Sequence, residues 1–205
     1  HDINDVALDR SIVTEASHSF SVLLDDWRVT DQGKTGRCWM FAGLNLLRVD
    51  TMKLLGLNQF EFSQNFLMFW DKLERTNFIL EAIIETADSA LDSRTVAWLL
   101  DRGIEDAGQW NMFVSLVKKY GVVPKTVMPE TESSANSGRM NSIINYQIRQ
   151  GANRIRDLYA SEAGMDELRQ IKDETLHVVY NILSIHLGSP PTKFSWQWKN
   201  KSGEF

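Results

Sequence analysis

Apolar residues recur about every three to four positions along most of the chain, which places them on one face of a helix. After Cys38 the pattern is carried by Phe41, Leu44, Leu47 and Leu54, and Gly56 follows as a suitable C-terminal cap. Ser63 is a suitable N-cap for the next apolar stretch. Helices are predicted at about 38–55, 64–87, 93–100, 109–120, 140–159 and 165–187, the third with Asp92 as its N-cap.

Two short stretches alternate apolar and polar residues instead, as strands do. They are Ser19–Leu24 and Phe194–Trp198, near the two ends of the chain. Between two predicted helices, Pro129–Arg139 is small and polar, which is typical of an exposed loop or linker. We therefore expect a mostly helical chain with short strands near its ends.

Composition narrows the class of protein. The chain has 205 residues and a net charge of −5, which argues against a large nucleic-acid surface. Its longest apolar runs fall far short of the ~20 residues of a membrane-spanning helix. A lone cysteine cannot form an internal disulfide, so a reducing compartment, the cytoplasm, is the simplest expectation.

That cysteine lies where a polar loop meets a predicted helix. A helix N-terminus stabilises a thiolate, which is the reactive form of cysteine. Gly36 allows a sharp turn just before it, and the amide of Gln32 carries donors suited to an oxyanion hole. A cysteine at a helix start is also a common packing residue, so a buried, inert Cys38 remains the alternative at this point.

The segment "DQGKTGRCWMFAGLNLLR" resembles the nucleophile segment of papain-like cysteine peptidases. Within that group it is most similar to the bleomycin hydrolase and bacterial aminopeptidase C family, in which an arginine, here Arg37, precedes the cysteine. Thr35 stands where the secreted papain type has a disulfide cysteine. The likeness continues, in order, through "FEFSQNFLMFWDKLERTNFILE", "ADSALDSR", "EDAGQWNMFVSLVKKYGVVPK" and "PPTKFSWQW".

The resemblance implies a role for five residues. Cys38 would be the nucleophile, Gln32 the side chain of the oxyanion hole, and Trp39 would pack behind the nucleophile. Gly108 would pair with the main chain of the substrate, and Ala107 would lie beside it in the substrate-binding segment. Ala107 replaces a glycine of the family and would be strained if that position needs a positive φ.

Two further departures flank the oxyanion donor. Asp31 and Gly33 stand where the family usually has Asn and Lys. We expect them to alter the surroundings of Gln32 slightly.

A base for the cysteine is not recognised in the chain. His177 lies within the ~130–150 residues downstream at which papain-like enzymes place their histidine. It belongs to an amphipathic helical pattern, however, whereas the family's catalytic histidine lies on a strand, and no Asn-Ser-Trp-Gly segment follows. The chain thus resembles the N-terminal half of such an enzyme and is predicted to be inactive alone.

The resemblance divides the chain into three parts and implies an α+β, papain-like fold class. Residues 1–124 would form the nucleophile-bearing lobe, 125–191 a helical insertion, and 192–205 the start of the return to a β-rich lobe. The implied activity is removal of N-terminal residues from short peptides through a cysteine thioester, without metal or cofactor. The implied partners are peptide substrates and further copies of the chain, since the family forms homohexamers.

Two other hypotheses stay open. In the first, the chain is a non-catalytic assembly or interaction module derived from this family. In the second, it is a helical protein of unrelated function in which Cys38 is only a packing residue. Neither alternative requires a reactive thiol.

Overall fold

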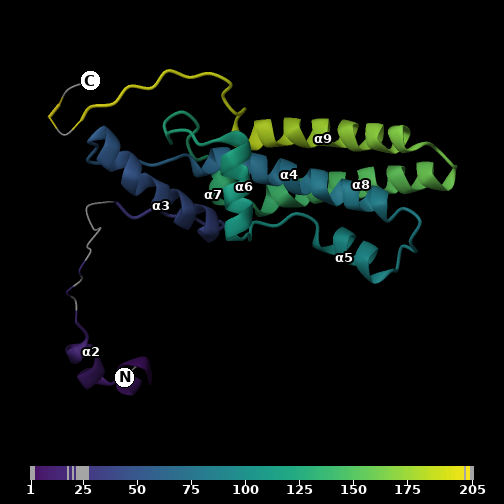
Figure 1. The fold of residues 1–205 in the computed structure, drawn as a ribbon. Coiled ribbons are helices and arrows are strands. Elements are labelled where there is room, and N and C mark those ends of the chain that lie inside the picture. Colours follow the sequence, from purple (N-terminus) through teal and green to yellow (C-terminus); the bar gives the residue numbers. More distant parts are fainter. Residues whose placement is uncertain (1–2, 18, 20, 22–27, 201, 204–205) are drawn as a thin grey trace.

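The computed structural model describes residues 3–17, 19, 21, 28–200 and 202–203, which form helices joined by loops (Figure 1). The helices are α1 (Ile3–Ala7), α2 (Arg10–Glu15), α3 (Cys38–Leu55), α4 (Gln64–Glu85), α5 (Arg94–Arg102), α6 (Trp110–Tyr120), α7 (Glu132–Ala135), α8 (Gly138–Ala160) and α9 (Met165–Leu187).

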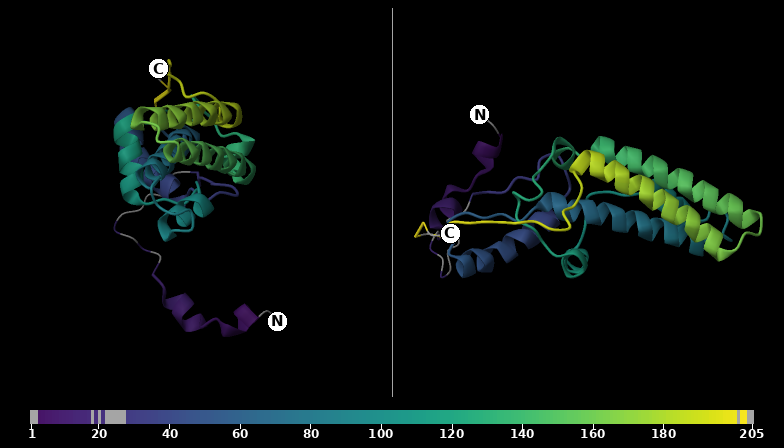
Figure 2. Two further views of the ribbon diagram at one scale, coloured as in Figure 1. Left: turned by 90° about the vertical axis from the view of Figure 1, so that its right-hand side faces the viewer. Right: turned by 90° about the horizontal axis from the view of Figure 1, so that it is seen from above.

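Three long helices, α4, α8 and α9, lie side by side and form the larger part of the body (Figures 1 and 2). Branched aliphatic side chains from each helix fill the space between them, as the helical spacing predicts. The most deeply buried are Leu67, Leu80, Ile83, Ile144, Ile155, Leu168, Val179 and Leu183. Gly151 allows α8 and α9 to approach closely, because a Cβ there would lie 2.6 Å from Thr175 Oγ1.

Helices α3 and α6 pack beside the near end of α4 and continue the same hydrophobic core. Gly43 of α3 lies directly on the ring of Phe113, where a Cβ would come within 2.6 Å of Cζ. A glycine in mid-helix normally weakens the helix, so its presence here reflects this close contact. This packing fixes the start of α3 relative to the loop that precedes α6.

The local signals located most helix ends correctly. The predicted bounds of α3 and α9 match the structure, Gly56 caps α3 with φ +62, and the Ser63 hydroxyl accepts the N–H of Phe66. Ser93 rather than Asp92 precedes α5, so that start was predicted one residue too early.

The strand predicted at Phe194–Trp198 was wrong: no strand forms among the described residues. The segment is extended but lacks a ladder, and the one antiparallel bridge in the described ranges joins Phe62 to Pro124. A strand needs the backbone groups of a neighbour, and Trp196 packs instead against Phe60, with ring centroids 5.5 Å apart. The other predicted strand, Ser19–Leu24, falls largely outside the described residues.

The prediction of an exposed linker at Pro129–Arg139 was also wrong. The segment contains α7 and the start of α8, and Ser134 and Ser137 are buried. These two serines form hydrogen bonds within the protein instead of facing water. One of them, Ser134 Oγ, donates to Glu130 Oε2 over 2.6 Å.

The first two helices stand away from the body (Figures 1 and 2). Their apolar side chains are exposed, among them Ile3, Val6, Ile12 and Val13. Within the described ranges, no helix combines the length and apolar character of a bilayer span.

Candidate functional site

Cys38 is the first residue of α3, and its side chain is exposed. The helix begins because the Arg37 carbonyl accepts the N–H groups of Met40 and Phe41, at 2.9 and 3.0 Å. The thiol therefore lies at the positive end of an 18-residue helix. The expectation of a buried filler does not fit this placement.

The turn before Cys38 is built around Gly33. This residue has φ +64, and a Cβ on it would meet the Ala135 carbonyl oxygen at 2.5 Å, so a side chain would be strained there and lack space. Asp31 Oδ1 accepts the Gly33 N–H over 2.8 Å, and the Lys34 N–H donates to the Ala135 carbonyl over 2.7 Å. Asp31 and Gly33, where the sequence departs from the family pattern, thus lie in a tight turn held against α7.

Arg37 is buried and anchors this turn. Its guanidinium donates from Nη1 and Nη2 to the two carboxylate oxygens of Glu130, at 3.1 and 2.8 Å. Nε donates to Thr35 Oγ1 over 3.0 Å, and the guanidinium lies 5.0 Å from the centroid of the Phe41 ring. The residue that distinguishes the family motif is therefore buried and has a structural role.

Gln32 lies half-buried in the same turn. Its main-chain carbonyl accepts the Thr35 hydroxyl over 2.7 Å, which holds its backbone in place. Its Oε1 is buried and has no hydrogen-bond partner in the part of the chain that the structure describes. The position of its backbone is fixed by Thr35, while the oxygen of the side-chain amide has an unused acceptor site.

Trp39 and Gly108 are brought together. A Cβ on Gly108 would lie 2.6 Å from Trp39 Cζ2, so the indole packs directly on the glycine backbone. The indole Nε1 donates to the Asp106 carbonyl over 2.8 Å. Ala107 is exposed and has a negative φ, so the strain considered for it does not occur, and its carbonyl accepts Arg75 Nη2.

Asp106 was not identified from the sequence, although it lies in the quoted "EDAGQW" segment. Its Oδ1 accepts Lys72 Nζ at 2.5 Å and Asn141 Nδ2 at 2.9 Å. Its Oδ2 accepts the Ser137 hydroxyl at 2.5 Å and the Gly36 N–H at 3.3 Å. We call these five residues the Asp106 network; no spacing in the sequence indicates that they meet.

The charges of this network are strongly perturbed. Burial would raise the pKa of Asp106, but the Lys72 ammonium and the hydrogen bonds from Lys72, Ser137 and Asn141 outweigh it and lower that pKa well below its usual value. Burial lowers the pKa of Lys72, and Asp106 opposes this effect. Burial likewise raises the pKa of the neighbouring Asp71, whose partner is Arg75.

Neither described histidine accompanies Cys38. His177 is exposed in the middle of α9, a helix that packs against α4 and α8. His186 ends the same helix, where Nδ1 lies 2.8 Å from Ser133 Oγ. His1 and His18 fall outside the described residues.

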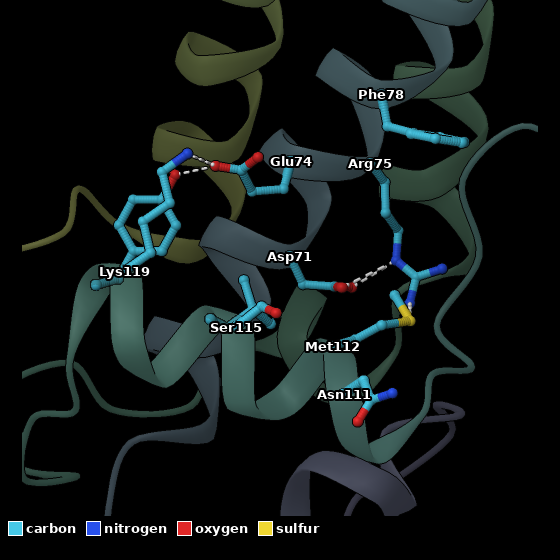
Figure 3. A pocket seen from close by; sticks show the side chains of 10 residues that line it. Asp71, Glu74, Arg75, Phe78, Asn111, Met112, Ser115 and Lys119 are labelled. Atoms are coloured by element: carbon cyan, nitrogen blue, oxygen red, sulfur yellow. Dashed lines mark hydrogen bonds and ion pairs between the residues drawn. The ribbon is translucent and has the colours of Figure 1, made fainter.

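A separate hollow of about 560 Å³ lies between α4 and α6 (Figure 3). Its charges pair with each other: Asp71 binds Arg75, and Glu74 binds Lys119 and Tyr120. Phe78 and Met112 add an apolar wall. None of the residues predicted for the site lines it.

Comparison with known proteins gives consistent relatives. The model of the Peptidase C1-like family matches residues 1–205. Aminopeptidase C of Listeria monocytogenes is 46% identical over 178 residues, which cover 87% of this chain and 40% of that protein. Human bleomycin hydrolase is 39% identical over 209 residues, covering all of this chain and 46% of that protein.

A solved structure shares the fold. The crystal structure of PepW from Lactobacillus rhamnosis HN001 matches with a TM-score of 0.92 and 40% identity, covering 98% of this chain and 45% of that one. The chain thus spans less than half the length of these relatives.

Proposed function

Because the chain belongs to the Peptidase C1-like family, we propose that it is the nucleophile-bearing part of a cysteine aminopeptidase that removes N-terminal residues from short peptides. Two relatives named aminopeptidase C and bleomycin hydrolase support this choice. The observation that carries it is the exposed thiol of Cys38 at the N-terminus of α3. A reducing compartment such as the cytoplasm would keep that thiol free.

The proposed chemistry has two steps. The Cys38 sulfur attacks the carbonyl carbon of the N-terminal residue, and the thiol proton passes to a base that returns it to the leaving amine. This leaves an acyl thioester on Cys38. Water then attacks the thioester, releases the amino acid and restores the thiol.

The negative charge of each tetrahedral intermediate needs donors that are already in place. We assign this role to the side-chain amide of Gln32 together with the N–H of Cys38. The support is the position of Gln32 in a turn that hydrogen bonds from Thr35 and Arg37 to its main-chain carbonyl hold in place, six residues before Cys38. Gly108, whose backbone is held flat against Trp39, would pair with the main chain of the substrate, next to Ala107.

We assign the base to a residue outside the described ranges, because His177 is exposed in the middle of α9 and His186 lies against Ser133. One face of α3 favours a further lobe packing there. Ala42 and Leu46 follow Cys38 by one and two turns and are exposed, and Leu46 retains 59% of its accessible surface. An apolar helix face left in water is typical of a surface that another body covers.

Two measurements test the proposal. The chain alone should not hydrolyse an aminoacyl-aminomethylcoumarin, yet iodoacetamide should alkylate native Cys38 readily. Fusion to the C-terminal part of the Listeria monocytogenes aminopeptidase C should yield hydrolysis that Cys38→Ala abolishes. Slow alkylation until unfolding, or hydrolysis by the fusion that survives Cys38→Ala, would refute the nucleophile assignment.

Self-association is the second proposal, and the exposed apolar side chains of α1 and α2 favour it. We expect further copies of the chain to cover them, as in a homohexamer. Sedimentation should then show oligomers that removal of residues 1–17 dissolves. If the chain forms oligomers but the fusion protein does not hydrolyse the substrate, the result would support a non-catalytic assembly module instead.

A further inference from the structure

The Asp106 network joins segments that lie far apart in the sequence and meet beside Cys38. Gly36, which donates its N–H to Asp106, lies two residues before the cysteine. Trp39, which donates its indole N–H to the main-chain carbonyl of the same aspartate, follows it directly. One residue therefore binds the chain on both sides of the cysteine.

The position of Asp106 is itself determined by buried partners. Lys72 of α4 has a side chain only 1% exposed, and its ammonium donates to the Asp106 carboxylate and to the Glu105 carbonyl. Ser137 and Asn141 hold the carboxylate from α8. A buried ammonium without its carboxylate is costly, so this aspartate cannot turn away without a large loss.

We propose that Asp106 is a positioning residue for Cys38: it ties the turn at Gly36 and the indole of Trp39 to α4 and α8, and so holds the thiol in register with the backbone of Gly108. This inference rests on the proposed role of Cys38. Asp106 touches neither substrate nor thiol. It acts through Gly36 and Trp39.

An asparagine at position 106 cannot satisfy the hydrogen bonds of the network. All four groups that face the carboxylate are donors: the Lys72 ammonium, the Asn141 amide, the Ser137 hydroxyl and the Gly36 N–H. An amide offers one oxygen, and its own NH2 would face two of those donors. The substitution conserves size but must release one side of the network.

The test measures alkylation of Cys38 by iodoacetamide in the chain as it stands, from about pH 6 to about pH 9. Release of the turn at Gly36 loosens the first turn of α3 and weakens the interaction of the Cys38 thiolate with the helix N-terminus. Asp106→Asn should therefore slow alkylation roughly two- to fivefold, the range of a helix-end interaction. The NMR signal of the Trp39 indole N–H should shift as well, because its acceptor moves.

Two controls separate positioning from lost stability. Glu105→Gln removes the adjacent carboxylate, which pairs with the exposed Arg102, and should leave alkylation unchanged. Ile155→Ala weakens the core of α8 about 21 Å along that helix from Asn141 and should lower stability without slowing alkylation. Equal slowing by Ile155→Ala would overturn the proposal.

A second variant serves if Asp106→Asn does not fold. Ser137→Ala combined with Asn141→Ala removes two donors and leaves the ion pair with Lys72 in place, and it should produce a smaller change in the same direction. Alkylation unchanged in folded Asp106→Asn would overturn the positioning role, and so would alkylation unchanged in this double variant if Asp106→Asn does not fold. Failure of wild-type Cys38 to react would instead refute the proposed nucleophile, so the two outcomes are distinguishable.

Discussion

The ion pair between Arg37 and Glu130 joins the turn before Cys38 to the segment that leads into α7, and Glu130→Gln tests what it contributes. The Arg37 side chain is 1% exposed and the Glu130 side chain 22% exposed. Glutamine has nearly the same shape but no charge, so it leaves a buried guanidinium without its counter-charge.

The size of the effect follows from this burial. Removal of one partner of a buried pair typically costs about 3–5 kcal/mol. Glutamine keeps one acceptor oxygen and Glu130 retains some contact with water, so we expect a loss of about 2 kcal/mol in the free energy of unfolding. With a urea dependence of about 2.5 kcal/mol per molar, the unfolding midpoint should fall by about 0.8 M.

Urea unfolding followed by circular dichroism measures this shift. The matched control is Glu174→Gln, which breaks an ion pair with Arg154 in which both side chains are about half exposed. That surface pair should contribute little to stability. A midpoint for Glu130→Gln no lower than that of the control would show that the buried pair adds nothing beyond a surface pair and would refute the expected effect of burial.

Three further predictions concern single positions. Gly108→Ala forces a Cβ against the Trp39 indole and should cost about 2 kcal/mol, with a changed near-ultraviolet dichroism of tryptophan; an unaltered spectrum would contradict the packing. Gly151→Ala should cost about 1–3 kcal/mol because it crowds Thr175, whereas Gly138→Ala, which meets nothing within 4 Å, should be neutral or slightly stabilising by urea unfolding. Because the pKa of Asp106 is lowered, its charge stabilises the fold at pH values above the ordinary aspartate pKa, and this contribution fades as the pH falls below that value. Wild type should therefore lose more stability than Asp106→Asn between about pH 5 and about pH 2.5. Equal losses would refute this prediction.

The helices and the nucleophile segment could be predicted from the sequence. Ser63, Gly56 and the apolar spacing of 165–187 are local signals, because a helix forms its hydrogen bonds within one segment. The exposed Cys38 at the start of α3 likewise follows from a polar turn that runs into an apolar pattern.

Features that depend on a second segment were missed. Phe194–Trp198 alternates like a strand, but a strand forms only where a neighbour supplies its hydrogen bonds. The small polar residues of 129–139 suggested a solvated linker, because composition does not distinguish side chains bonded to water from those bonded to protein. Ala107 was predicted to be strained if its φ were positive, and only the structure shows that its φ is negative.

The sequence by itself determined where the helices run and where the thiol lies, since both depend on residues a few positions apart. Only the tertiary structure decided what holds that thiol in place. Glu130, the ion-pair partner of Arg37, and the side-chain partners of Asp106 lie 31 to 93 residues away along the chain, and no periodicity connects residues that meet solely because the chain folds back on itself.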